Sequence, residues 1–472
     1  MESLENNKEM DNRVDYTNLV TVTIDGESAK DFDDAISIEK IENGNYILYV
    51  HIADVSYFVK SGMNLQQEAY KRGTSVYLGN HVFPMFPSQL SNGLCSLNPG
   101  ELKFTKTCKM EIDRTGKVVD FLIVNSMIRS NKRMTYQAVD EVLEQGRIPD
   151  GYEDFVSELM LMKELNSILQ IKKIKRGYTL FCHDEKDFVF DEYGYPKNVN
   201  VKTNSLAREI IENFMLSANE VIASYLHFME VPTLYRNHEA PKKYHLEKVI
   251  KILKETGYWN NQIDMNDPFL VAKLLKRYRN KKEYLYLSRI LLKSMSRAYY
   301  DSKCGGHYGL GLFYYTHFTS PIRRYPDFLV HETLNRVWNG EVFLNEEYEQ
   351  LSLKGSYLSE REVAATEAEI EYDRYLLSLY AEQFRKKELQ AEIVFLDKEN
   401  LYLSTTQYLE GVLGHNGEYD RKHKQVLING KSYHIGDKIT VVLDENTNEE
   451  GQYIFQFSKS EGKRLIKKKI GK

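Results

Sequence analysis

The sequence predicts an α+β fold in which helices surround a mixed β-sheet and a small all-β barrel follows. Three observations support this prediction. Short runs of alternating apolar and polar residues fill about the first 135 positions, which is the period of half-buried strands. Apolar residues then recur at helical spacing through the middle of the chain. Alternating runs return after Leu389, where turn residues separate them.

Composition limits the class of protein. The chain has 472 residues, 42% of them hydrophobic, which is enough for one large core and a smaller accessory domain. Its net charge of −5 means that a polyanionic partner would be held by local basic surface. Cys95, Cys108, Cys182 and Cys304 form no CxxC pair, so neither a zinc site nor a disulfide framework is predicted.

The same composition bears on location. The first 15 residues are polar and acidic, unlike a signal peptide, and no apolar run reaches membrane-spanning length. We therefore expect a soluble cytoplasmic protein with no membrane partner. Residues 1–18 are predicted to be a disordered acidic lead-in, because few of them are apolar.

The first predicted strand ends in a strongly acidic loop. Val20, Val22 and Ile24 alternate with polar residues, and a second alternating run covers 35–40. Between them lie four aspartates: Asp25, Asp31, Asp33 and Asp34. Carboxylates this close repel one another unless protons or a cation intervene, and Mg²⁺ prefers such ligands. The alternative is a solvated acidic loop.

Further elements follow along the chain. Asn43-Gly44 predicts a tight hairpin turn, because both residues tolerate positive φ. Helices are predicted over 155–174 and 206–228, with a short β segment over 178–196 between them. Glu212 lies off the apolar face of the second helix, and by spacing alone it is an ordinary surface glutamate.

Basic residues gather in two places. Arg289, Lys293 and Arg297 recur every four residues and are predicted to share one helical face, either solvated or a track for a phosphate backbone. In Thr319–Arg324, Pro321 stiffens the chain beside Arg323 and Arg324, whose guanidiniums fit phosphate oxygens. Two arginines on a surface turn are the alternative.

The C-terminal part is predicted to be all-β. Helical spacing continues over 345–387, and about five short strands then fit into about 70 residues. This density suits a barrel of the OB type, which binds single-stranded nucleic acid. The last residues, 461–472, are a basic tail suited to polyanions.

With these pieces assembled, the chain resembles the ribonuclease II/ribonuclease R family of 3′→5′ exoribonucleases. The resemblance rests on motifs that occur in family order: TIDGESAKDFDDA, HIADVSYF, RGTSVY, LSNGLCSLNPG, TLYRNHE and YTHFTSPIRRYPDFLVH. It implies a catalytic RNB domain over 19–387, formed by the mixed sheet and its helices. An OB-fold RNA-binding domain over 388–460 follows.

The family implies an activity and its partners. These enzymes hydrolyse single-stranded RNA to nucleoside 5′-monophosphates in RNA turnover, with Mg²⁺ as cofactor and Mn²⁺ as a possible substitute. We expect a monomer whose partner is single-stranded RNA. The alternative is a catalytically silent RNA-binding protein on the same fold, but a pure binder has no need of four mutually repelling carboxylates. A general OB-fold RNA chaperone would explain only about the last 80 residues.

The resemblance also implies roles in the chemistry. Asp25 and Asp34 match direct metal ligands, and Asp31 completes the metal cluster with them. Asp33 matches the acid on which the reaction depends most, which orients the attacking water. Arg323 matches the arginine that faces the scissile phosphate.

Other residues match positions that contact RNA. Tyr77 and Phe181 resemble an aromatic clamp on the bases at the 3′ end, although RGYTLFCHDE departs from the commoner RG-x-x-DF form. Tyr136 and Glu212 fall where the family contacts ribose 2′-hydroxyls. Arg324 is expected to contact RNA beside Arg323, and Glu367 to match a further active-site glutamate.

One departure from the family is large. Full-length relatives carry two cold-shock-type OB domains before the catalytic domain, whereas here about 19 residues precede the first strand. We therefore expect a chain without these domains, which binds RNA more weakly and is less obstructed by duplex.

Overall fold

The chain folds into two compact units. The computed structural model describes residues 12–178, 185–202, 205–255, 264, 266–281, 284–420, 423–447, 452–459 and 461. The first unit draws on Met1–Tyr178, Asn204–Glu239 and Arg297–Glu369, and the second on Thr179–Thr203, Ala240–Ser296 and Ile370–Lys472. The predicted domain boundaries are not decided by this division and stay predictions.

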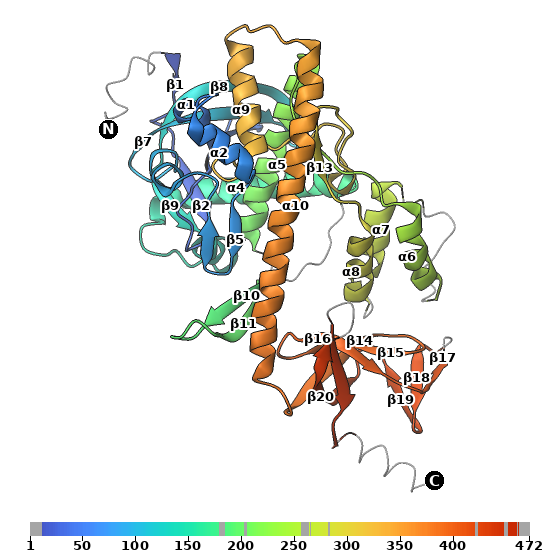
Figure 1. Ribbon diagram of the computed structural model, residues 1–472. Coiled ribbons are helices and arrows are strands. Elements are labelled where there is room, and N and C mark those ends of the chain that lie inside the picture. The colour runs from blue at the N-terminus through green and yellow to red at the C-terminus, as the bar shows by residue number, and fades with distance from the viewer. Residues whose placement is uncertain are drawn as a thin grey trace. The chain divides into compact units, whose positions relative to one another are not determined.

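A seven-stranded sheet forms the centre of the first unit (Figure 1). Its strands, in spatial order, are β1 (Val14–Asp15), β8 (Val118–Arg129), β7 (Leu102–Ile112), β4 (Tyr46–Ala53), β3 (Asp34–Lys40), β2 (Val22–Asp25) and β9 (Lys132–Thr135). The pairs β1/β8 and β2/β9 are parallel and the others antiparallel, which confirms the predicted mixed sheet.

Helices and short hairpins complete the first unit. The helices are α1 (Val55–Phe58), α2 (Asn64–Arg72), α3 (Tyr136–Asp140), α4 (Val156–Lys175), α5 (Leu206–Phe228), α9 (Tyr325–Trp338) and α10 (Asn345–Glu382), whose residues after Glu369 belong to the second unit. Single turns of helix cover Gln89–Leu94, Glu141–Gln145, Glu153–Phe155 and Tyr308–Leu310. Two small hairpins pair β5 (Val76–Leu78) with β6 (His81–Phe83) and β12 (Tyr235–Asn237) with β13 (Tyr299–Asp301).

The core of this unit lies between the sheet and α4 and α5. All eight residues of β4 are buried, as expected of a central strand. Leu48 and Val50 of this strand share one apolar cluster with Leu165 of α4 and Phe214 of α5. Each such side chain contributes about 1.5–3 kcal/mol by leaving water. The sheet is thereby a rigid base for the loops at its strand ends.

The predicted limits of the second helix are confirmed. Helix α5 covers Leu206–Phe228, and its N-terminus is capped by Ser205, whose hydroxyl accepts the Arg208 N–H at 3.2 Å. Apolar residues repeat along one face for 23 residues, so packing and periodicity agree here.

Two expectations are wrong. Disorder was expected over 1–18, and for the described residues 12–18 this is wrong, because β1 pairs with β8 and the buried Arg13 guanidinium lies 2.7 Å from Asp54. Residues 1–11 lie outside the described part of the chain. The stripe of three cations also fails, because α8 (Tyr284–Ser294) ends before Arg297.

The second unit contains a closed barrel (Figure 1). Its strands run in the order β14 (Glu388–Leu396), β15 (Asn400–Thr405), β16 (Glu410–Gly414), β21 (Tyr453–Phe457) and β20 (Lys438–Thr447). The predicted small all-β barrel is thereby confirmed. Gly411 is required where β16 meets β21, since a Cβ there would lie 1.9 Å from the Tyr453 carbonyl oxygen.

Smaller elements accompany the barrel. They are α6 (Lys243–Glu255), α7 (Pro268–Tyr278), α8, the hairpin of β10 (Glu185–Phe190) and β11 (Pro196–Lys202), and the sheet of β17 (Glu418–Asp420), β18 (Gln425–Ile428) and β19 (Lys431–His434). Tyr286 of α8 stacks on Phe395 of the barrel with ring centroids 3.8 Å apart, and Arg289 pairs with Glu410 at 2.7 Å. One cation of the expected stripe is therefore neutralised inside this unit.

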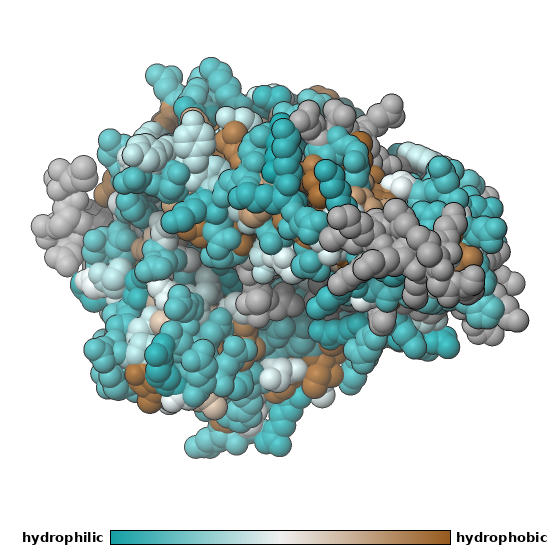
Figure 2. Space-filling model, turned by 90° about the horizontal axis from the view of Figure 1, so that it is seen from below, coloured by the Kyte–Doolittle hydropathy of each residue, from teal (hydrophilic) through white to brown (hydrophobic). Residues whose placement is uncertain are grey.

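The surface is mostly polar where it can be seen. Figure 2 shows a face on which hydrophilic residues dominate and hydrophobic ones are scattered in small groups, as on ordinary protein surfaces. Among the described residues, no helix combines the length and the apolarity that crossing a membrane requires.

Candidate active site

The ends of three neighbouring strands bring the acidic residues together. Asp25 is the last residue of β2 and Asp34 the first of β3, and these two strands pair with each other. Strand β9 runs parallel to β2 on its other side, with Thr135 opposite Asp25. Tyr136, which follows Thr135, is thereby placed beside the carboxylates.

A cavity of about 240 Å³ opens over this cluster. Residues predicted for the site line it: Asp25, Asp31, Asp33, Asp34, Tyr136, Glu212, Arg323 and Arg324. Others lining it were not predicted: Ile211, Met215, Leu216, Asn219, Tyr315, Thr319 and Ser320. The structure therefore brings together residues from positions 25 to 324 of the chain.

Burial and mutual repulsion make the carboxylates reluctant to ionise. The pKa of Asp25 is raised to about 8 by burial first and then by repulsion from Asp34 and Asp31. Burial also raises the pKa of Asp34 to about 6, against the lowering effect of Arg323 and Arg324. In the protein alone these carboxyl groups therefore keep their protons at pH values at which an isolated aspartate is ionised.

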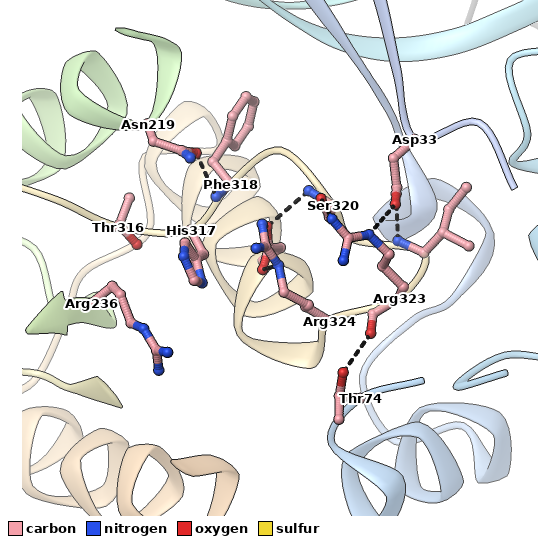
Figure 3. A network of polar contacts seen from close by, with 12 residues as sticks. Asp33, Thr74, Asn219, Arg236, Thr316, His317, Phe318, Ser320, Arg323 and Arg324 are labelled. Atoms are coloured by element: carbon pink, nitrogen blue, oxygen red, sulfur yellow. Dashed lines mark hydrogen bonds and ion pairs between the residues drawn. The ribbon is translucent and has the colours of Figure 1, made fainter. Parts of the chain in front are cut away.

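Asp33 is held by the segment that carries the arginines. Its side chain is buried, and Oδ1 accepts the Ile322 N–H at 2.8 Å. The other oxygen, Oδ2, lies 3.6 Å from Nε of Arg323 (Figure 3). Burial raises the pKa of Asp33 well above its usual range, although Arg323 and the Ile322 N–H oppose this. Asp33 and Arg323 are therefore neighbours in the wall of the pocket.

The two arginines have different surroundings. The Arg323 side chain is 43% exposed, and its Nη2 donates to the Ser320 hydroxyl at 3.0 Å. The Arg324 guanidinium is forked onto the buried carboxylate of Asp327 at 2.7 and 2.9 Å. Arg323 is thus free to meet a ligand, whereas Arg324 is largely committed inside the fold.

The residues just before the strand of Tyr77 bind the arginine segment. The Ser75 N–H donates to the Arg323 carbonyl at 3.0 Å. The Thr74 hydroxyl donates to the same oxygen at 3.1 Å (Figure 3). Burial raises the pKa of the Tyr77 phenol, as do Asp31 and Asp33, while Arg323 lowers it. Tyr77 does not line the cavity but lies within electrostatic reach of it.

Tyr136 and Glu212 approach the cavity from α3 and α5. The Arg208 guanidinium lies 4.6 Å from the centre of the Tyr136 ring. Glu212 accepts from Lys173 at 2.7 Å and from the Tyr178 hydroxyl at 3.1 Å. Both residues line the cavity, and the two hydrogen bonds of Glu212 show that it is more than a solvated surface glutamate.

Two predicted residues are not placed in the cavity. Phe181 lies outside the residues that the structure describes. Glu367 is not among the described residues lining the cavity, and it pairs with Arg297 at 3.0 Å on an exposed surface. Two residues further along α10, Glu369 accepts the Tyr77 N–H at 2.8 Å.

Helical spacing could have pointed to two residues that sequence reasoning missed, Asn219 of the cavity and Glu369 beside Tyr77. Asn219 lies seven residues after Glu212, so both occupy one face of α5. Glu369 likewise lies seven residues after Glu362 on α10. The Glu362 carboxylate accepts two hydrogen bonds from the Arg236 guanidinium, at 2.5 and 3.0 Å. Glu367 is off that face.

The donor chemistry of the cluster fits a hard divalent cation. Oδ2 of Asp25 is buried without a hydrogen-bond partner, and burial, Asp34 and Asp31 raise the pKa of this carboxyl although Arg133 and Arg323 lower it. Within the described residues, no three His, Cys, Asp or Glu side chains are arranged to hold a metal ion by themselves. Carboxylates assisted by water and substrate phosphate are the usual ligands of Mg²⁺. The observations therefore favour such a cation without a complete protein cage.

Comparisons with known proteins agree with these features. A family model described as RNB domain matches residues 13–340. The chain is 42% identical to Ribonuclease R of Thermotoga maritima over 369 residues, covering 77% of the chain and 52% of that protein. It is 34% identical to Ribonuclease R 1 of Lactococcus lactis over 465 residues, covering 95% of the chain and 56% of that protein. The chain thus spans about half the length of these relatives.

A solved structure has the same fold. RNase R of Mycoplasma genitalium in complex with ribose methylated single-stranded RNA matches with a TM-score of 0.84 and 27% sequence identity. The match covers 96% of this chain and 73% of that one.

Proposed function

The chain belongs to the RNB domain family, and from this premise we propose that it hydrolyses single-stranded RNA from the 3′ end, releasing nucleoside 5′-monophosphates. One observation carries the proposal: four aspartates and Arg323 line one cavity together with Tyr136 and Glu212. A catalytically silent RNA-binding protein would gain nothing from burying carboxylates whose pKa values are raised.

The proposed metal ligands are Asp25, Asp31 and Asp34, with Mg²⁺ as the ion and Mn²⁺ as a substitute. A divalent cation there supplies charge neutralisation for the phosphodiester and lowers the pKa of water. Asp33 is proposed to orient the attacking water, since its carboxylate is fixed by the Ile322 N–H and lies beside Arg323.

The other residues bind and orient the RNA. Arg323, which is partly exposed, faces the scissile phosphate and stabilises the charge that grows on its oxygens, an effect of about 3–4 kcal/mol in comparable sites. Tyr77 stacks on a base, which needs no particular sequence. Tyr136 and Glu212 accept or donate hydrogen bonds at ribose 2′-hydroxyls, which distinguish RNA from DNA. Arg324 supports Arg323 from its pair with Asp327.

The barrel is proposed to be an OB-type module for single-stranded RNA. Its strand order, first-second-third-fifth-fourth, agrees with a five-stranded Greek-key barrel. A monomeric, cytoplasmic protein completes the proposal.

The test is the fate of a labelled RNA. Single-stranded RNA with a 5′ label, incubated with the protein and Mg²⁺, is expected to shorten stepwise from the 3′ end, while a chelator stops the reaction. Asp33→Asn is expected to abolish shortening and to leave RNA affinity within about threefold, since the change removes a charge but no volume. Asp113→Asn, in a turn of the same unit, is the control and should keep full activity. Binding without shortening by the unaltered protein would identify the silent alternative.

A further inference from the structure

A further buried carboxylate, outside the lining of the cavity, lies next to the proposed active site. Asp327, in the first turn of α9, is 0% exposed. Its Oδ1 accepts the Ser320 N–H at 2.8 Å and an Arg324 nitrogen at 2.7 Å, while Oδ2 accepts Nε of Arg324 at 2.9 Å. Three N–H donors replace the water that this carboxylate loses on burial.

These bonds hold both ends of one turn. The Arg324 N–H also donates to the Ser320 carbonyl at 2.9 Å, and this backbone hydrogen bond closes the turn from Ser320 to Arg324. Its middle carries the Ile322 N–H and the Arg323 side chain, and both of these face Asp33 (Figure 3). A shift of this turn would therefore displace two contacts of Asp33 together.

We propose that Asp327 is a positioning residue for RNA hydrolysis: it fixes the turn from Ser320 to Arg324 so that Arg323 points at the phosphate beside Asp33. This inference rests on the proposed function. Asp327 is not among the described residues that line the cavity, so it acts through the turn and not on the substrate.

The same unit offers a matched control. Asp54 is also buried, and it pairs with Arg13 at 2.7 Å and with Lys106 at 3.4 Å. Its partners lie on the N-terminal strand segment and on β7, and Asp54 is not among the described residues lining the cavity. Loss of either carboxylate leaves buried cations unpaired and costs stability, but only Asp327 holds the catalytic turn.

The experiment compares Asp327→Asn with Asp54→Asn in the full chain. Melting temperatures, and kcat and KM on single-stranded RNA with Mg²⁺, are measured at a temperature at which circular dichroism shows both variants folded. Both variants should have lower melting temperatures than the unaltered protein. Asp327→Asn should lower kcat at least about tenfold with a KM change below about threefold, as expected for a misplaced catalytic group. Asp54→Asn should keep kcat. An equal fall of kcat in both would overturn the proposal.

A double-mutant cycle with Arg323→Ala tests the route of the effect. If Asp327 acts through Arg323, Asp327→Asn should change kcat less than about twofold in the Arg323→Ala background. A full additional loss there would overturn the proposal.

A second variant covers the case in which Asp327→Asn does not fold. Arg324→Met combined with Asp327→Leu removes both buried charges, an exchange that often preserves stability. A folded double variant with unchanged kcat would refute a positioning role. Failure of the proposed function would look different, since the unaltered chain would then release no mononucleotides.

Discussion

At the scale of single residues, two adjacent arginines are predicted to respond differently to the same change. Arg323→Ala should lower kcat about 100-fold or more with little loss of stability, because this side chain is partly exposed and meets charge that develops in the reaction. Arg324→Ala should destabilise the fold by about 3–5 kcal/mol, since it leaves the carboxylate of Asp327 buried and unpaired.

Denaturant titrations beside single-turnover kinetics measure both effects. Arg385→Ala, which removes an exposed ion pair on the other unit, serves as the control. Equal losses of stability in Arg323→Ala and Arg324→Ala would contradict the contrast.

A pH-dependent stability effect is predicted at Glu332. This residue of α9 lines a cavity of about 600 Å³, and burial raises its pKa to about 7 although Lys354, Arg336 and Lys60 lower it. The folded state therefore holds the proton more tightly than the unfolded state. The resulting cost to stability is absent below the unfolded pKa of about 4.5 and complete above about pH 7.

Glu332→Gln should remove that cost. At pH 8 it should raise the free energy of unfolding by about 3 kcal/mol, and the gain should vanish as the pH falls to 4.5. Urea titrations across this range measure it, with the exposed Glu360→Gln on α10 as control. A gain that is constant with pH would show that another property of the amide is responsible.

At the scale of elements, the packing of α10 depends on one glycine. A Cβ at Gly355 would lie 2.6 Å from the Tyr300 carbonyl oxygen of β13 and 3.1 Å from Leu234. Gly355→Ala should therefore lower stability by about 1–3 kcal/mol despite the better helix propensity of alanine.

Ser356 is exposed on the same helix, so Ser356→Ala changes the helix propensity without a steric clash. This variant should have an unchanged or slightly higher stability. Thermal unfolding of the two variants decides the matter. A stabilised Gly355→Ala would mean that α10 moves away from β13 at little cost.

Elements defined by local periodicity were predictable, and those defined by remote partners were not. The sequence of helix α5 repeats apolar residues at helical spacing, and the limits of the helix were predicted correctly. Arg13 looks like part of a polar tail until Asp54 and β8 are known to lie beside it. Four-residue spacing placed Arg297 on a helix that ends at Ser294, because the spacing of cations says nothing about where the backbone turns.

The same division applies to the candidate site. The acidic cluster was predictable because its members are adjacent in sequence. The ion pair between Arg324 and Asp327 was not anticipated, although the two residues are only three positions apart. An arginine can bind either a substrate phosphate or a carboxylate of its own chain, and the sequence does not show that Arg324 and Asp327 are buried together. Glu367 was predicted and Glu369 was missed. Which side of a long exposed helix faces the rest of the protein depends on its packing partners, and the sequence of the helix alone does not identify them.

At the scale of the whole molecule, local cations and not net charge are predicted to hold RNA. The chain carries a net charge of −5, so it gains no general attraction for a polyanion. Affinity for single-stranded RNA should still fall with salt, with a log–log slope of about −0.7 for each neutralised phosphate. Filter binding with the Asp33→Asn variant measures this slope without degradation. A salt-independent affinity would indicate that stacking alone retains the RNA.

The hydrogen bond between the Ile322 N–H and Asp33 joins residues 289 positions apart in the sequence. During synthesis the N-terminal part of a chain emerges first, and contacts between distant segments form last. The carboxylates thus leave the ribosome long before the arginine that faces them. For the proposed nuclease, the growing chain would stay harmless to the messenger that encodes it until the segment that carries Arg323 has been made.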